Sequence, residues 1–183
     1  LYKGYKIVPY CPRCGTALSS HEVAQGYKVV KEKSVFVKFK KKGEENTYFL
    51  VWTTTPWTLS SNVALCMHPD YDYAEIRTES GNYILAEALV PTLFDEYEVV
   101  SRKKGKDYEY CEYEPMYPYA LGTFKEKAYY VTNDTYVTLS DGTGIVHIAP
   151  AFGEDDSNVG KKYNLPFVKL VDERGKFVDA VEP

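Results

Sequence analysis

The pattern of apolar and polar positions predicts a chain built mostly of short strands. Apolar residues alternate with lysines in residues 35–40, and an apolar run fills residues 47–54 after a polar turn with Gly43. Period two is typical of strands, so residues 28–55 predict a hairpin. Further strands are predicted at 5–10, 63–67, 73–78, 82–85, 97–101, 128–132, 136–139 and 144–149, with a closing hairpin at 167–171 and 176–178.

Helical signals are fewer and shorter. Thr55 before Pro56 is a typical N-cap and first-turn pair, so a short helical turn is predicted at 56–60. Residues 87–96 have one apolar face, although a proline limits the regular part, and residues 154–163 open on three acids that favour a helix start. The segments at 102–107 and 108–119 are expected to form a basic turn and an irregular stretch.

These elements together predict an α+β fold that is mostly β. We expect a mixed, mostly antiparallel sheet curled into a barrel, with short helices at its periphery. The length of 183 residues, with 44% apolar and 26% charged positions, suits one folded domain with a small appendage. We therefore expect one globular domain at 28–183 and a linker at 1–27 that carries a possible half of a zinc knuckle.

Charge and hydropathy limit the classes of partner that this chain can bind. The formal net charge of −4 argues against a protein that coats a long duplex, but permits contact with a short single-stranded end. The sequence has no run of 18 apolar residues, so it predicts no transmembrane helix, and no signal peptide is visible. Because the chain starts at Leu1 and stops at Pro183, we interpret both ends as boundaries within a larger protein. A processed mature chain is the alternative.

Two of the four cysteines have the spacing of metal ligands. Cys11 and Cys14 flank a two-residue turn followed by Gly15, as in a zinc knuckle. A structural zinc site needs four ligands, and the sequence has no second CxxC. The pair is interpreted as half of a zinc site that other residues complete, or as two free thiols in a turn.

Three further features carry polar chemistry. Residues 52–59 read WTTTPWTL, and their hydroxyls sit where a buried strand meets a helix start, a place that can bind a carbonyl or position a water. Strand propensity and an N-cap explain two of these threonines equally well. His147 lies in an apolar strand, where a core residue and a pocket wall are both plausible. The acids after Gly153 fit helix capping, or a carboxylate that holds an ammonium group.

The residues alone name no reaction, but three ordered motifs resemble one family. WTTTPWTL with Asn62, the segment 142–156 reading GTGIVHIAPAFGEDD, and the opening 8–23 reading VPYCPRCGTALSSHEV all look like the editing insertion of isoleucyl-tRNA synthetases. The resemblance runs from about Tyr10 to Val178. The valine and leucine enzymes carry Arg where this chain has Thr55, which favours the isoleucine enzyme. The middle third, 78–127, has no motif of use.

The resemblance implies a β-barrel editing domain that hydrolyses valyl-tRNA(Ile) and valyl-adenylate through a size sieve. The HIGH and KMSKS signatures of the ATP-dependent ligase site are absent from this sequence. The resemblance also implies that editing needs no cofactor and that the full-length enzyme holds a structural zinc. The implied partners are the 3′ end of charged tRNA(Ile), valyl-adenylate and the rest of the synthetase in cis. A cytoplasmic location, no membrane contact and a monomeric fragment are also expected.

The resemblance also implies residue roles. Asp156 would hold the α-ammonium, and His147 would block the larger isoleucine side chain. Thr53, Thr54 and Thr55 would bind the terminal adenosine and ester and orient water, with Thr54, Thr55 and Asp156 as the catalytic set. Trp52, Trp57 and Asn62 would line or brace the pocket. The competing hypotheses are a zinc-ribbon-like nucleic-acid binding module, a catalytically inactive structural insertion and a free-standing editing protein.

Overall fold

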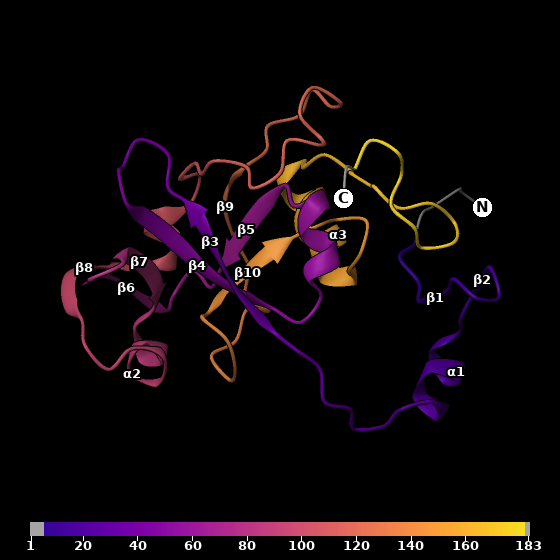
Figure 1. The fold of residues 1–183 in the computed structure, drawn as a ribbon, viewed down its shortest axis with the longest axis horizontal. Helices are drawn as coiled ribbons and strands as arrows, with labels where there is room; N and C mark the ends of the chain where they lie inside the picture. The colour runs from indigo at the N-terminus through magenta and orange to yellow at the C-terminus, as the bar shows by residue number, and fades with distance from the viewer. Residues whose placement is uncertain (1–5, 182–183) are drawn as a thin grey trace.

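A computed structural model of the chain describes residues 6–181, and its strands outnumber and outweigh its helices (Figure 1). The strands are β1 (Tyr10–Cys11), β2 (Thr16–Ala17), β3 (Val35–Lys40), β4 (Thr47–Thr53), β5 (Ala64–Met67), β6 (Asp72–Thr78), β7 (Gly81–Ala86), β8 (Glu98–Lys104), β9 (Tyr130–Asn133) and β10 (Ile145–Ile148). The α-helices are α1 (Ser20–Gln25), α2 (Val90–Leu93) and α3 (Glu154–Tyr163), and the 3-10 helices are η1 (Pro56–Ser61), η2 (Glu87–Leu89) and η3 (Gly105–Tyr108).

The larger sheet has five strands in the order β3-β4-β7-β6-β8. β3 and β4 form the predicted antiparallel hairpin, with Val35 opposite Thr53, and β4 continues into a parallel pairing with β7. The alternation in β3 turns Val37 and Phe39 inward and leaves the lysine positions outside. The end of β4 thus carries the threonines to the rim of the sheet.

The smaller sheet has three strands in the order β10-β5-β9. β5 runs antiparallel to β10 and parallel to β9, and all four of its residues are buried. β10 also lies against β4, which brings the late strand with His147 next to the end of the threonine strand. A two-stranded ribbon of β1 and β2 stands apart from both sheets.

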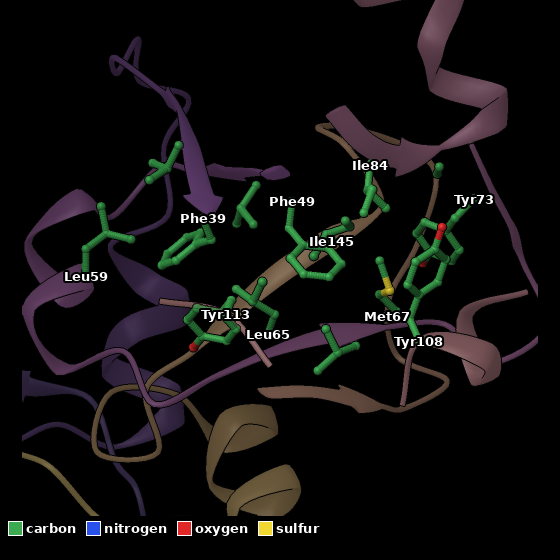
Figure 2. Close-up of a cluster of buried hydrophobic side chains, with 14 residues drawn as sticks. Phe39, Phe49, Leu59, Leu65, Met67, Tyr73, Ile84, Tyr108, Tyr113 and Ile145 are labelled. Carbon is green, nitrogen blue, oxygen red and sulfur yellow. The ribbon is translucent and has the colours of Figure 1, made fainter. Parts of the chain in front are cut away.

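An aromatic-rich core holds the two sheets together. Figure 2 shows Phe39 and Phe49 of the large sheet facing Leu65 and Ile145 of the small one, with Tyr113 beside them. The rings of Phe39 and Tyr113 meet edge to face at 5.2 Å between centroids, a favoured aromatic geometry. A second cluster, which includes Val63, Ile148 and Val159, seats α3 on the small sheet.

The α+β, mostly β prediction is confirmed, with one difference in how the sheets close. Within residues 6–181 the strands pair into separate sheets, so no closed barrel is found. Both parallel and antiparallel pairs occur, as the mixed-sheet prediction requires. α3 has the bounds predicted from its opening acids, and Asn164 ends it in the left-handed conformation that asparagine tolerates.

Several local predictions are wrong. Residues 136–139 form no strand, because Asp134 and the hydroxyls of Thr138 and Ser140 make local turn bonds while Val137 and Leu139 pack into two different clusters. The expected basic turn at 102–107 is strand up to Lys104, which pairs with Asp72 on β6.

The ends of the chain also differ from their predictions. The first expected strand shrinks to Tyr10–Cys11, and Tyr5 lies outside the described residues. The closing hairpin is a turn held by the single bridge between Val171 and Phe177. The helical segment after residue 86 is split into η2 and α2, in keeping with its proline at the second position of α2.

Candidate active site

A cavity of about 270 Å³ lies where the end of β4, the strand β10 and the start of α3 meet. Its walls come from two of the sequence motifs that are almost a hundred residues apart. The lining residues are Trp52, Thr53, Thr54, Thr55, Tyr136, Val146, His147, Gly153, Glu154, Asp155 and Asp156. The fold therefore brings together six of the eight predicted site residues.

The threonine wall is a tight turn between β4 and η1. Thr53 is buried, and its hydroxyl accepts the backbone N–H of Thr55 at 3.1 Å. Thr55 occupies the N-cap position of η1, but its hydroxyl makes no capping bond to the helix. The Thr54 and Thr55 side chains are exposed at the cavity, where a ligand can reach them. The Thr55 hydroxyl lies 3.4 Å from the Thr53 hydroxyl.

His147 forms a buried wall of the cavity and is fixed by Thr58. The Thr58 hydroxyl donates its only proton to the carbonyl of Thr55 at 2.8 Å and lies 3.0 Å from Nε2 of His147. With the Thr58 proton on the Thr55 carbonyl, Nε2 carries the imidazole proton and donates it to Thr58. Burial lowers the pKa of His147 to about 4, so the ring is neutral near pH 7.

The other nitrogen of this ring remains an acceptor. Among residues 6–181, Nδ1 of His147 is buried and has no hydrogen-bond partner. A neutral, oriented ring of this kind adds a rigid, uncharged wall to the cavity.

Asp156 supplies a carboxylate at the third position of α3. Burial raises the pKa of this carboxyl to about 6, and the neighbouring charge of Asp155 adds to the rise, while the backbone N–H of Ala149 donates to the carboxylate and lowers it. The group is therefore largely ionised at pH 7 but poorly solvated. A carboxylate in that state gains most from an incoming cation such as an ammonium group.

Gly153 makes room for this carboxylate. A Cβ at position 153 would lie 2.0 Å from Oδ2 of Asp156, which no side chain permits. The glycine has an extended backbone conformation that any residue can adopt, so space and not backbone freedom requires it. The N-cap of α3 is thus shaped around the Asp156 carboxylate.

Two predicted site residues lie outside the cavity lining. Trp57 points to solvent with 56% of its surface exposed. Asn62 is buried, donates to the carbonyl of Ala64 at 2.8 Å and accepts the Tyr113 hydroxyl at 2.6 Å. Asn62 therefore braces the segment between η1 and β5, and its contact is with the core.

Sequence reasoning also missed several residues of the site. Thr58 was within the motif but had no role, and its only signal was its place in a row of hydroxyls. Tyr136 and Val146 line the cavity from segments that were interpreted as ordinary strands. Gly153 gave no signal of its own, because its importance comes from a contact with a side chain of the following helix turn.

The cysteine pair has the local geometry of a knuckle. The backbone N–H of Cys14 donates to Sγ of Cys11 at 3.4 Å, and this bond lowers the pKa of Cys11. Gly15 takes the left-handed conformation that closes the turn. Within residues 6–181 no group of three metal-ligating side chains forms, so the described residues do not complete a zinc site. The half-site remains a prediction.

Within residues 6–181, none of the helices has the length and apolar character needed to cross a membrane.

No family model matches the sequence. Curated relatives do: the isoleucine–tRNA ligase of Clostridium acetobutylicum is 63% identical over all 183 residues of this chain. The isoleucine–tRNA ligase of Picrophilus torridus is 52% identical over 97% of the chain.

The chain belongs to the isoleucine–tRNA ligase family. It corresponds to a segment of these ligases, since it spans 18% of the clostridial relative and 17% of the Picrophilus one. The predicted resemblance to isoleucyl-tRNA synthetases is thereby confirmed.

Solved structures place this ligase segment in the same fold as leucyl-tRNA synthetase editing domains. The CP1 domain of GlLeuRS superimposes with a TM-score of 0.56 at 16% identity, covering 72% of this chain and 65% of that one. The editing domain of the P. knowlesi cytosolic leucyl-tRNA synthetase gives 0.55 at 14% identity, covering 78% and 70%. At these identities the likeness concerns the fold, and it confirms the editing-domain type of architecture.

Proposed function

We propose that this chain is the editing domain of an isoleucine–tRNA ligase. It hydrolyses two substrates, valyl-tRNA(Ile) and valyl-adenylate. The observation that carries the proposal is the cavity itself, which gathers the threonine turn, neutral His147 and the desolvated Asp156 carboxylate. The high identity to isoleucine–tRNA ligases along the full chain supports the choice of amino acid and tRNA.

The need for such a site follows from the substrates. Valine is isoleucine without one methylene, and the discrimination of these two by isoleucyl-tRNA synthetases is the well-known example in which a hydrophobic pocket gains only about 1–3 kcal/mol. A second cavity that admits valine and excludes isoleucine supplies the missing selectivity. The volume of about 270 Å³, shared between the amino acid and part of the adenosine, suits a small side chain.

Each wall has one role in the proposed reaction. Asp156 binds the α-ammonium of the valyl group through charge-assisted hydrogen bonds. The exposed hydroxyls of Thr54 and Thr55 hold the ester and the attacking water. The His147 ring limits the depth of the side-chain space, and its fixed orientation through Thr58 makes that limit sharp.

The chemistry requires no covalent intermediate. The water oxygen attacks the ester carbonyl, the bond from that carbon to the ribose oxygen breaks, and the ribose oxygen takes up the proton that the water loses. The products are free valine and uncharged tRNA. Positioning of the water and hydrogen bonds to the developing oxyanion lower the barrier.

The experiment is deacylation of valyl-tRNA(Ile) and isoleucyl-tRNA(Ile) by the chain, by Asp156→Asn and by Asp155→Asn. We expect valine release that exceeds isoleucine release, that is lost in Asp156→Asn and that persists in Asp155→Asn, an exposed carboxylate on the same turn. Equal release of both amino acids would contradict the sieve. Equal activity of the two variants would contradict the ammonium role of Asp156.

The remaining parts of the proposal concern the setting. The rest of the synthetase acts in cis and delivers the charged 3′ end, and the reaction takes place in the cytoplasm. Cys11 and Cys14 would supply two thiolate ligands to a structural zinc of the full-length enzyme.

A further inference from the structure

Positive charge is concentrated in the segment that leads into and includes β3, the strand paired with β4 of the cavity wall. Residues 28–42 contain seven lysines and one glutamate, a net charge of +6, in a chain whose total is −4. This segment covers the connection between α1 and β3, β3 itself and the turn that follows. In Figure 1 the connection runs as an extended trace from α1, which stands apart from the sheets, to the start of β3.

The strand register fixes how this segment meets the cavity. Val35 pairs with Thr53, and Phe36 pairs with Trp52, so two residues of β3 lie directly opposite two residues of the cavity wall. Phe36 and Trp52 share the outer face of the sheet, and 50% of Phe36 is exposed. Lys33 precedes Val35 by two residues, within about 7 Å along an extended chain.

The lysines of this segment differ in their acidic partners. Lys40, Lys41 and Lys42, at the far end, form ion pairs with Glu114, Glu44 and Glu112 respectively.

On the connection that enters β3, Lys31 and Lys33 are exposed and have no carboxylate partner among residues 6–181. Lys38 is also exposed, and its ammonium donates to the Tyr83 hydroxyl at 2.7 Å, which leaves its charge uncompensated. We define the basic strip as Lys31, Lys33, Phe36 and Lys38.

The opposite side of the cavity is acidic. Glu154 and Asp155 are exposed on the first turn of α3 and line the cavity there. A phosphodiester chain that leaves the cavity is repelled by these carboxylates and attracted by the strip. Charge therefore selects one direction for a nucleic acid whose last residue occupies the cavity.

We infer that the basic strip binds the nucleotides that precede the terminal adenosine of a single-stranded RNA end, with Phe36 stacked on a base and Lys31 and Lys33 at phosphates. Single-strand binding sites combine these two elements, aromatic faces for bases and cations along the backbone. The inference rests on the proposed function and adds to it the path of the RNA. It also explains how a chain with a negative total charge binds a polyanion at one place.

The test separates the strip from the cavity by the size of the ligand. The probes are a non-hydrolysable 3′-valylamido-adenosine, which fills the cavity alone, and the same group at the 3′ end of an RNA tetranucleotide. We expect the tetranucleotide to bind at least about 10-fold more tightly. Phe36→Ala and the double variant Lys31→Gln with Lys33→Gln should each remove most of that gain and leave nucleoside binding unchanged.

Salt dependence provides a second measurement. The slope of log affinity against log salt for the tetranucleotide should fall by about 1.4 in the double lysine variant, since each phosphate contact to a single strand contributes about 0.7. Phe167→Ala and Lys169→Gln are the controls, because both residues are exposed, two positions apart, on a segment outside the helices and strands. They should keep the full gain and the full slope.

The outcomes distinguish the two proposals. A gain that is absent, or that survives both strip variants, overturns the basic strip while the nucleoside result stands. Failure of the nucleoside to bind overturns the proposed function, and an uncharged RNA tetranucleotide then tests the strip separately. Binding of that RNA that is weakened by the strip variants alone supports the strip, and binding that they do not affect contradicts it.

Discussion

Asp156 is a carboxyl group in a place that disfavours its charge. Burial raises its pKa to about 6 from an ordinary value near 3.8, so the folded protein binds this proton more tightly than the unfolded chain. The free energy of unfolding therefore falls as pH rises through the interval from about 4 to 6, and the ionised group destabilises the fold above that interval. The same ionised form is the one that attracts an ammonium group.

We therefore expect Asp156→Asn to stabilise the protein at pH 8, by about 1–3 kcal/mol, while it abolishes valine release. The amide can still accept the N–H of Ala149, so little else changes. The gain should shrink below pH 6 and vanish near pH 4. Urea unfolding across this pH range measures it, with Asp155→Asn as the control. A difference in stability that is independent of pH would contradict the assigned burial cost.

The same titration predicts the pH dependence of the wild-type reaction. Protonation of Asp156 removes the partner of the substrate ammonium, so valine release should decline as pH falls below about 6. His147 stays neutral throughout this range because burial lowers its pKa to about 4. Initial rates between pH 5 and 8 measure the decline, and a constant rate down to pH 5 would contradict it.

Thr58 acts at the residue scale through its partner His147. Thr58→Val keeps the shape of the side chain but removes the acceptor of the Nε2 proton, which costs about 1–3 kcal/mol for the unpaired buried donor. The freed ring should let isoleucyl-tRNA(Ile) be hydrolysed, so the ratio of valine to isoleucine release falls.

Thr92→Val is the matched control for Thr58→Val. Thr92 donates to the carbonyl of Leu89 at 2.7 Å, the same local bond that Thr58 makes to Thr55, but it has no histidine partner. An unchanged ratio in Thr58→Val, or an equal change in Thr92→Val, would show that Thr58 does not fix the histidine.

At the scale of elements, the start of α3 is built around one side chain. Gly153→Ala would place a methyl group 2.0 Å from Oδ2 of Asp156, so the carboxylate must move out of its position. We expect valine release to fall by at least about 10-fold while the helix remains. Gly26→Ala is the control, because a methyl group there meets only ordinary contacts. Wild-type activity in Gly153→Ala would show that the carboxylate position is not needed.

The strongest sequence patterns predicted their elements well. The acids of α3 predicted the bounds that the structure has. The alternation at residues 35–40 marks β3, but the predicted hairpin began at residue 28 and residues 28–34 form no strand. Residues 136–139 alternate in the same way but form no strand. Their apolar side chains pack into two clusters on different elements, a choice that local sequence does not encode.

At the scale of the whole molecule, the N-terminal part is an appendage. α1 has no buried residue, and the core clusters begin at Val37. Pro12 lies against the turn at Gly175, with its Cβ 3.3 Å from where a Cβ of that glycine would lie.

Removal of residues 1–27 should therefore change the melting temperature by less than about 3 °C, because surface segments contribute little to stability. Calorimetry of the shortened chain measures the change. A loss of more than about 10 °C would show that residues 28–183 are not an independent unit.

The sequence by itself determined the strand-rich composition, the threonine turn, the acidic helix start and the resemblance to isoleucyl-tRNA synthetases, because each is written in contiguous residues. Tertiary structure decided which of them meet. The fold sets His147 of β10 against Thr58, which lies 89 residues earlier. It leaves Trp57 exposed and Asn62 buried in the core. Burial in the tertiary structure also lowers the pKa of His147 and raises that of Asp156, since desolvation depends on what the whole chain packs around a group.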